Sequence, residues 1–227
     1  MKHPFYNEWL KKRLDKTINI LGKDWFRGKS ILELGACHGD FGISFIEMGS
    51  FVTFCDARIE HLLTIEQNLP IKSPIIQLDQ NFPYDLGKKY DMVVHFGLLY
   101  HIENWKQDLK CALNHTNLML LESAVCPDNS IEDSFCEGSD YCYDEYNCKC
   151  PIFTEKSVEK TLSDLGAKFI RFDNIELNTY GWISDNVVLQ NVYNWNSDNY
   201  RMYENVLNLP KEIEHRIHYR RFWLVIK

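Results

Sequence analysis

Between residues 30 and 166 the chain alternates short apolar runs of strand length with stretches of helical periodicity. Predicted strands lie at 30–34, 51–55, 75–78, 91–96 and 118–122, and predicted helices at about 41–48, 59–68 and 105–113. Strands separated by helices are typical of βαβ units, because the helix carries the chain back so that the next strand runs parallel to the last. The alternation therefore predicts an α/β fold with a doubly wound, mostly parallel sheet.

The flanking regions complete one predicted domain over residues 1–227. A helix is predicted to begin after Thr154, a good N-cap residue, and to end at Gly166, and strands are predicted at 168–172 and 221–226. A further helix at 7–21 caps the sheet or the mouth of a cofactor site, or simply packs on the core. Three parts of the domain are expected to lie outside the sheet: an N-terminal helical cap (1–27), a lid insertion rich in Cys, Tyr and acids (126–152), and a second insertion on the substrate side (174–209).

The composition favours an ordinary globular protein that acts on small ligands. With 227 residues, 45% of them hydrophobic and 25% charged, the chain can bury the core of one domain. It has no run of about eighteen apolar residues, and its start does not resemble a signal peptide, so we expect a cytoplasmic protein without membrane spans. A net charge of −7 argues against nucleic acid as a partner.

Eight cysteines are many for an intracellular protein. Cys37, Cys55 and Cys111 fall in elements that we expect to be buried, where a free thiol packs as a small hydrophobic group. The other five crowd one polar stretch: Cys126, Cys136, Cys142, Cys148 and Cys150. Their spacing lacks the paired C-x2-C knuckles of structural zinc sites. Free thiols are therefore favoured and no metal site is predicted, with a metal site and disulfides as the alternatives.

A glycine-rich turn, ELGACHG at residues 33–39, follows the first predicted strand. Gly35 and Gly39 lack a Cβ atom, so the backbone there can take unusual dihedral angles and approach a ligand closely. Open α/β sheets bind ligands at the carboxyl ends of their strands. The turn therefore predicts a cofactor site.

The spacing of the glycines separates two classes of cofactor. Dinucleotide enzymes use G-x-G-x-x-G to seat a pyrophosphate, whereas this chain has G-x-x-x-G-x-x-G and lacks the middle glycine. Glu33, just before the turn, suits a cationic cofactor that bears an amino acid better than it suits a diphosphate. Asp56, at the end of the second predicted strand, is placed for a bidentate hydrogen bond to ribose hydroxyls, although NAD enzymes use such an acid too.

The turn resembles motif I of class I S-adenosylmethionine-dependent methyltransferases, (D/E)-x-G-x-G-x-G, with Cys37 in place of the frequent middle glycine. Asp56 resembles the ribose-binding acid of that family, and Asp79, in the segment LDQ, resembles the partner of the adenine amine. Residues 91–101 resemble the family's fourth-strand motif with its LLYH ending. The resemblance covers roughly residues 28–125 and the closing strand. It implies a Rossmann-like sheet of seven strands with an antiparallel last strand.

For the cofactor, the resemblance implies S-adenosylmethionine, with S-adenosylhomocysteine as the product. The cofactor-binding residues that it implies are Glu33, Gly35, Ala36, Cys37, Gly39, Asp56, Ala57, Arg58, Asp79, Gln80 and Phe96.

Two residues are candidates for the catalytic step. Methyl transfer from a sulfonium is an in-line displacement, which needs positioning and often a base that takes the proton of a hydroxyl or amine. His101 leads because it follows the fourth strand and its ordinary pKa lies near neutrality. Glu122, at the end of the fifth strand, is the second candidate, and it either accepts a proton or only orders the site. His95, in mid-strand, is expected to pack in the core.

Aromatic residues near acids and amides predict where the acceptor binds. The expected substrate-binding residues are Tyr100, Tyr141, Tyr143 and Trp182. Such surfaces suit a sugar and equally suit other polar small molecules. Alternatively, the lid insertion is a solvated acidic segment that its aromatic residues anchor to the body.

The sequence thus predicts methyl transfer to a hydroxyl or amine of a small molecule or glycan. An RNA-modifying methyltransferase of the same fold is one alternative, because some wobble-uridine modifying enzymes resemble the GLLYH region, although the acidity argues against it. A nicotinamide-dependent oxidoreductase or a non-catalytic binding module is the other. No oligomeric state is predicted.

Overall fold

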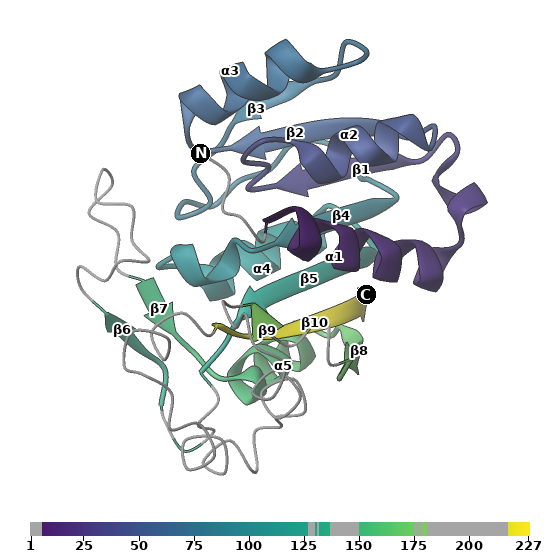
Figure 1. Ribbon diagram of the computed structural model, residues 1–227. Helices are drawn as coiled ribbons and strands as arrows, with labels where there is room; N and C mark the ends of the chain where they lie inside the picture. Colours follow the sequence, from purple (N-terminus) through teal and green to yellow (C-terminus); the bar gives the residue numbers. More distant parts are fainter. Residues whose placement is uncertain are drawn as a thin grey trace, which may run out of the picture.

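The computed structural model describes residues 6–126, 130, 132–136, 150–174, 177, 179–180 and 218–227. Their main feature is one sheet between two layers of helices (Figure 1). Its strands are β1 (Ser30–Leu34), β2 (Phe51–Asp56), β3 (Ile75–Gln77), β4 (Met92–Phe96), β5 (Leu118–Ala124), β8 (Lys168–Phe172), β9 (Thr179–Tyr180) and β10 (His218–Ile226). A separate hairpin consists of β6 (Ser134–Cys136) and β7 (Cys150–Ile152).

The strand order is β3-β2-β1-β4-β5-β10-β8, with the short β9 paired to β10. Strands β1 to β5 pair in parallel, whereas β10 runs antiparallel to both β5 and β8. This path confirms the expected seven-stranded, mostly parallel sheet with an antiparallel last strand. The chain turns back across the sheet between β1 and β4, and open α/β sheets bind ligands at the carboxyl ends of the strands beside such a switch point.

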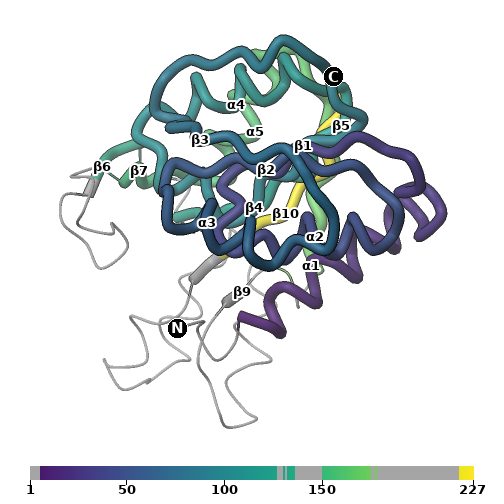
Figure 2. Tube along the Cα trace, turned by 90° about the horizontal axis from the view of Figure 1, so that it is seen from above, coloured from purple at the N-terminus to yellow at the C-terminus, as the bar shows by residue number. Residues whose placement is uncertain are grey.

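The helices lie on both faces of the sheet (Figure 2). Three of them, α1 (Tyr6–Leu21), α2 (Asp40–Glu47) and α3 (Ile59–Asn68), pack on one face, which we call the α1–α3 face. The other, the α4–α5 face, carries α4 (Trp105–Asn114) and α5 (Glu155–Asp164). Two 3-10 turns, η1 (Lys23–Phe26) and η2 (Leu99–His101), follow α1 and β4. Each face encloses its own apolar core, as a doubly wound sheet requires.

The alternation of side chains along the strands sets which residues meet at the carboxyl edge. Glu33 of β1 pairs in register with Phe54 of β2, and Asp56 follows Phe54 by two residues. Phe54 is buried in the core of the α1–α3 face. Glu33 and Asp56 therefore point to the same face at adjacent strand ends, which is the geometric condition for one ligand to lie near both carboxylates.

The predicted helices and parallel strands all exist, with ends that shift by a few residues. The N-cap is also confirmed, because the Thr154 side chain accepts a hydrogen bond from Ser157 N at 3.2 Å. The hairpin of β6 and β7 was not predicted, since it lies in the segment that we expected to lack regular structure. Strand β10 begins at His218, before the predicted start at 221.

Three further observations concern the described residues only. No helix among them is both long and apolar enough to cross a membrane. Cys37, Cys55, Cys111, Cys126 and Cys150 carry free thiols. No group of three or more His, Cys, Asp or Glu side chains within these parts of the chain is arranged to hold a metal ion. Cys142 and Cys148, in the middle of the expected lid, lie outside the described residues.

Candidate cofactor and acceptor site

The turn between β1 and α2 carries three residues with left-handed backbone, Gly35 (φ 63°), Cys37 (φ 49°) and Gly39 (φ 73°). Gly39 N donates to Ala36 O at 2.7 Å, and Ala36 N donates to Cys55 O of β2 at 2.9 Å. These bonds fix the turn at the carboxyl edge of the sheet. The left-handed dihedral angles of Gly35 and Gly39 are of the unusual kind that the sequence predicted. The space that a Cβ atom would take is filled by protein side chains, Leu98 at Gly35 and Ile65 and Phe54 at Gly39.

Cys37 occupies the position of the frequent middle glycine, and its φ explains that frequency. A left-handed backbone is strained for a residue that carries a Cβ atom, whereas glycine adopts it freely. Burial raises the pKa of the Cys37 thiol to about 12, with the nearby Asp56 carboxylate adding to the shift. The thiol is therefore neutral near pH 7, and it acts as a small packing group.

Glu33 holds the turn to the helix that follows it. The side chain is 4% exposed, and its Oε2 accepts a hydrogen bond from Gly42 N, in the first turn of α2, at 2.9 Å. Burial raises the pKa of Glu33 to about 8, despite the hydrogen bond from Gly42, and the charges of Asp40 and Asp56 act in the same direction. Near pH 7 the group is therefore mostly protonated, which does not fit the expected role of a negative charge beside a cationic cofactor, and its contact with Gly42 is a structural role that the sequence analysis did not foresee.

Asp56 links the same turn to β2 and α3. Its Oδ2 accepts from Cys37 N at 2.8 Å, and its Oδ1 accepts from Arg58 N at 2.9 Å and lies 3.1 Å from His61 Nδ1. Burial alone would raise the pKa of Asp56, but the hydrogen bonds from His61, Arg58 and Cys37 outweigh it and hold this pKa below its ordinary value. The group is therefore a carboxylate at neutral pH.

These contacts modify the expected bidentate bond to ribose. A carboxylate offers about four acceptor positions. Cys37, Arg58 and His61 take three of those on Asp56. One position has no partner among the described residues, and a second ribose hydroxyl would compete with His61.

The segment after β3 lies beside this carboxylate, because Leu78 N donates to Asp56 O at 2.9 Å and Gln77 Nε2 donates to Ala57 O at 3.0 Å. Asp79 is exposed, and its Oδ1 accepts from Asn81 N at 2.9 Å. The backbone bonds place the start of the segment that carries Asp79 and Gln80 next to Asp56 and Ala57, and the contact of Asp79 and Gln80 with a cofactor stays a prediction.

Gln80 provides a test of whether these residues fit a nucleoside cofactor. It is 3% exposed, and its Nε2 has no hydrogen-bond partner within the described part of the chain. A buried donor without a partner is costly. An acceptor on a bound ligand would satisfy it, so the residues fit the cofactor.

Phe96 differs from its expected role. Its ring is 6% exposed and lies 4.9 Å from the Phe41 ring and 5.3 Å from the Phe222 ring, centroid to centroid. The side chain belongs to the core of the α1–α3 face. Only the backbone at the end of β4 is left to contact a cofactor.

The loop after β4 lies against the cofactor turn. It begins with Gly97 (φ 66°), and a Cβ atom at Gly35 would meet Leu98 Cδ1 at 2.8 Å. Tyr100 and His101, in η2, have ring centroids 4.2 Å apart. Tyr100 Oη accepts from Arg220 Nη2 of β10 at 3.0 Å. The leading base candidate is therefore carried by a loop that contacts the turn of motif I.

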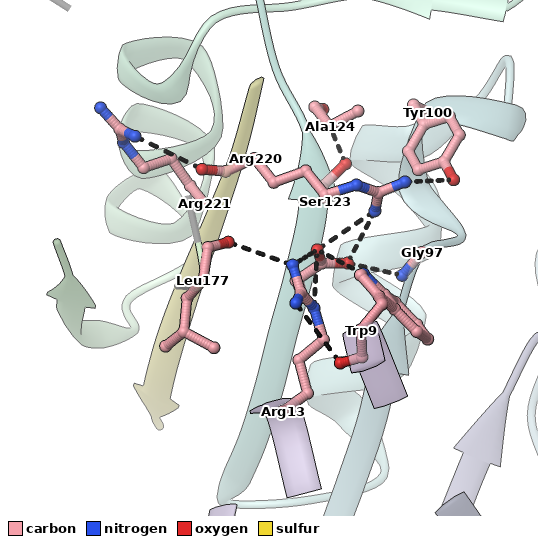
Figure 3. A network of polar contacts seen from close by, with 10 residues as sticks. Trp9, Arg13, Gly97, Tyr100, Ser123, Ala124, Leu177, Arg220 and Arg221 are labelled. Atoms are coloured by element: carbon pink, nitrogen blue, oxygen red, sulfur yellow. Dashed lines mark hydrogen bonds and ion pairs between the residues drawn. The ribbon is translucent and has the colours of Figure 1, made fainter. Parts of the chain in front are cut away.

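Glu122 lies at the centre of a buried network, and its partners are labelled in Figure 3. Its Oε1 accepts from Arg13 Nη2 at 2.8 Å and from Arg220 Nη1 at 3.1 Å, and its Oε2 accepts from Gly97 N at 3.1 Å. Trp9 Nε1 lies 3.4 Å from the same Oε1. Burial would raise the pKa of Glu122, but the charges of Arg220 and Arg13 outweigh it and lower this pKa.

The expectation that Glu122 accepts a proton is therefore not supported. The residue is fully buried, and a carboxylate with a lowered pKa and several donors on both oxygens is a poor base. The other expectation, that Glu122 orders the site, agrees with these contacts. The sequence analysis identified neither Arg13 nor Arg220 as a site residue. The one local signal was the spacing of four residues from Trp9 to Arg13, which places both side chains on the same face of α1.

The remaining predicted site residues divide into two groups. His95 is fully buried on the α4–α5 face, where its Nε2 lies 2.6 Å from Asp108 Oδ2, so it packs in the core as expected. Tyr141, Tyr143 and Trp182 lie outside the described residues.

This fold, with two acidic residues at adjacent strand ends, is typical of proteins that bind a nucleoside cofactor at the carboxyl edge of a doubly wound sheet. A family model described as "Methyltransferase domain" matches residues 6–171. The chain belongs to this family: it is a class I methyltransferase, and the cofactor of the class is S-adenosylmethionine. No curated protein matches the chain by sequence.

Three solved structures illustrate the likeness of fold. A putative S-adenosylmethionine dependent methyltransferase from Listeria monocytogenes is 12% identical with a TM-score of 0.64, over 97% of this chain and 99% of that one. The magnesium protoporphyrin IX methyltransferase from Synechocystis PCC 6803, with bound SAM, is 14% identical with a TM-score of 0.59, over 100% and 86%. The O-methyltransferase from a trans-AT PKS multienzyme of Brevibacillus brevis, with S-adenosyl-L-homocysteine, is 17% identical with a TM-score of 0.60, over 98% and 75%.

Proposed function

We propose that this methyltransferase transfers the methyl group of S-adenosylmethionine to a hydroxyl or amine of a small molecule or glycan, with His101 as the general base. The observation that carries the proposal is the contact between the loop after β4 and the cofactor turn, at Leu98 and Gly35. His101 follows Leu98 by three residues on that loop. A base near a cofactor turn is where transfer to a protonated acceptor needs it.

The cofactor is held, in this proposal, by the residues at the ends of β1, β2 and β3. The open acceptor position of Asp56 takes a ribose hydroxyl, and Asp79 and Gln80 take the adenine ring. Glu33, Gly35 and Gly39 shape the turn that receives the amino-acid portion. When bound, S-adenosylmethionine supplies a methyl group that is electrophilic because it is attached to a sulfonium.

The proposed class of acceptor rests on the net charge of the chain and on the names of two similar structures. A chain with a net charge of −7 is poorly suited to the phosphate backbone of a nucleic acid. Two of the similar structures are named for action on a porphyrin and for O-methylation in a polyketide multienzyme. These names support, for this chain, a small organic acceptor.

The cofactor is tested by calorimetry with S-adenosylhomocysteine and with NAD. We expect binding of the former alone, and about a tenfold loss of affinity (about 1.4 kcal/mol) in Asp56→Asn, because hydrogen bonds to a charged group are lost. Asp164→Asn, an exposed acid in an i,i+4 pair on α5, is the matched control and should bind like the wild type. Binding of NAD alone would defeat the proposal.

The acceptor is tested by mass spectrometry of a metabolite and glycan extract that has been incubated with the protein and deuteromethyl-labelled cofactor. Label is expected in a small molecule or glycan. His101→Gln should lower the initial rate of labelling by about 10²–10⁴-fold if His101 is the base. Label that appears only in bulk tRNA, in a parallel reaction, would replace this proposal with RNA modification.

A further inference from the structure

Glu122 joins three segments that are far apart in the sequence (Figure 3). Its carboxylate receives donors from Arg13 of α1, from Gly97 after β4 and from Arg220 of β10. The side chains of Glu122, Arg13 and Arg220 are 0%, 1% and 5% exposed. The network is therefore sealed from solvent.

Stability alone does not account for a buried network of this kind. Removing charges from water is costly, and apolar residues of similar volume often stabilise a fold equally well or better. What such a network supplies is a fixed geometry, since each partner must keep its place for the charges to stay compensated. The question is which part of the site this geometry fixes.

The part of the site that the Glu122 carboxylate contacts most directly is the Gly97 amide. Gly97 N donates both to the backbone oxygen of Glu122 at 3.0 Å and to its Oε2 at 3.1 Å. Gly97 has a φ of 66°, so it is the residue at which the chain changes direction after β4. The next residue, Leu98, meets the cofactor turn. The carboxylate thus sets the path of the loop that leads to His101.

A second route runs through Arg220. Its guanidinium contacts both Glu122 oxygens and donates to Tyr100 Oη at 3.0 Å. It also lies over the Tyr100 ring, 5.2 Å from the centroid. Since the Tyr100 ring is adjacent to the His101 ring, Arg220 transmits the position of Glu122 to the base candidate.

We propose that Glu122 is a positioning residue for methyl transfer, which holds the loop of Gly97 to His101 against the cofactor turn and ties its position to α1 through Arg13. The inference rests on the proposed function, because the loop matters only if transfer occurs beside it. It assigns no proton transfer to Glu122.

The test compares Glu122→Gln with a matched variant on the opposite face. Glu155→Gln breaks a second buried pair, that of Glu155 with Arg221, whose side chains are 2% and 0% exposed. Its partners Arg221 and Arg171 belong to β10 and β8 on the α4–α5 face. Both variants remove a buried charge of the same kind, so a loss that stems only from weakened folding appears in both.

Three quantities are measured for each protein. The first is the affinity for S-adenosylhomocysteine by calorimetry, and the second is the initial rate of methyl transfer from saturating cofactor into the extract. The third is the Gly97 amide resonance in protein labelled with 15N-glycine, assigned by its absence in Gly97→Ala. We expect Glu122→Gln to bind the product within about threefold of the wild type, to shift the Gly97 resonance, and to lose tenfold or more in rate.

Each outcome decides the matter. A Glu122→Gln protein with the wild-type rate and Gly97 resonance overturns the inference, and so does a Glu155→Gln protein with an equal loss of rate. If Glu122→Gln fails to fold, Glu122→Asp takes its place, because it keeps the buried charge but shortens the reach to Gly97 N and Arg220, and an unchanged rate there is equally decisive. Failure of the wild type to bind S-adenosylhomocysteine would instead contradict the proposed function.

Discussion

At the scale of single residues, Cys37 shows how one strained position shapes the cofactor turn. Its φ of 49° is a left-handed value, which costs an L-residue with a Cβ atom about 1–2 kcal/mol relative to its preferred backbone. Glycine avoids this strain, but a glycine also loses more conformational entropy on folding, by about 0.5–1 kcal/mol. The strain exceeds the entropy effect by roughly 0.5–1 kcal/mol, which favours glycine but is small enough for a cysteine to be tolerated here.

These two energies predict different outcomes for two substitutions of Cys37. Cys37→Gly should keep the thermal midpoint and the affinity for S-adenosylhomocysteine close to the wild type. Cys37→Val should lower both, because a β-branched side chain resists the left-handed region. Thermal denaturation and calorimetry check the pair, and a Val variant as stable as the Gly variant would show that the turn takes another conformation.

Glu33 should make the free energy of unfolding depend on pH, and the direction follows from its pKa. Its pKa is about 8 in the folded chain, against an ordinary value of 4.5, because of burial. The folded state therefore holds a proton that the unfolded state releases between these two values. The free energy of unfolding should fall as pH rises from about 5 to about 8, by an amount on the order of a few kcal/mol.

Glu33→Gln removes this titration, because an amide cannot ionise, while it keeps an oxygen acceptor for Gly42 N. We expect the difference in unfolding free energy between the wild type and Glu33→Gln to change across this pH window, with the variant gaining on the wild type as pH rises. Urea denaturation at a series of pH values measures it. Parallel curves for the two proteins would contradict the assignment.

At the scale of elements, helix α2 is packed so closely on the sheet that its first turn requires a glycine. A Cβ atom at Gly42 would clash with the Phe54 ring and with Glu33 Oε2. Gly42 has no left-handed backbone, so the clash and not the dihedral angle decides the effect of a substitution. In an open helix position, Ala in place of Gly stabilises by about 1 kcal/mol.

Gly42→Ala should therefore destabilise the protein, by about 1–3 kcal/mol or more, where helix propensity alone predicts a gain. Gly87→Ala is the control, because a Cβ atom at Gly87 meets nothing within 4 Å and the residue carries only backbone strain (φ 68°). Urea denaturation of the two variants measures the difference. A stabilised Gly42→Ala protein would mean that α2 sits farther from β1 and β2.

The sequence predicts best those elements whose buried residues recur at a regular spacing along the chain. The strands β1, β2, β4 and β5 and the helix α3 are such cases, since apolar residues recur at the spacing of each element. The β6–β7 hairpin lacks this signal, because its strands are three residues long and bound a segment rich in polar residues. Its pairing depends on contacts between distant positions.

The same limit applies to the site. Motif I, Asp56 and the loop ending at His101 are local patterns, so their position at one edge of the sheet follows from the parallel strands. The partners of Glu122 are not local, and no spacing in the sequence links Arg13 or Arg220 to it. Phe96 was predicted to bind the cofactor from the resemblance alone. The burial of its ring was likewise missed, because its neighbours in the core come from α2 and β10.

At the scale of the whole molecule, a ligand that binds only the folded state should stabilise it by mass action. S-adenosylhomocysteine at one hundred times its dissociation constant contributes about 2.7 kcal/mol. For a chain of 227 residues this should raise the thermal midpoint by about 5–10 °C. NAD should leave the midpoint unchanged, and Asp56→Asn should show a smaller shift at the same ligand concentration. Equal shifts with both ligands would count against a selective site.

The order of the strands along the chain also determines when the active enzyme can exist during synthesis. A growing polypeptide that has passed β5 contains Glu122 and Arg13, but Arg220 and the strand that closes the gap between β5 and β8 are made later. Until then the edge of β5 is open to pairing with other chains. Translation that stops short of β10 should therefore yield aggregation-prone protein without activity.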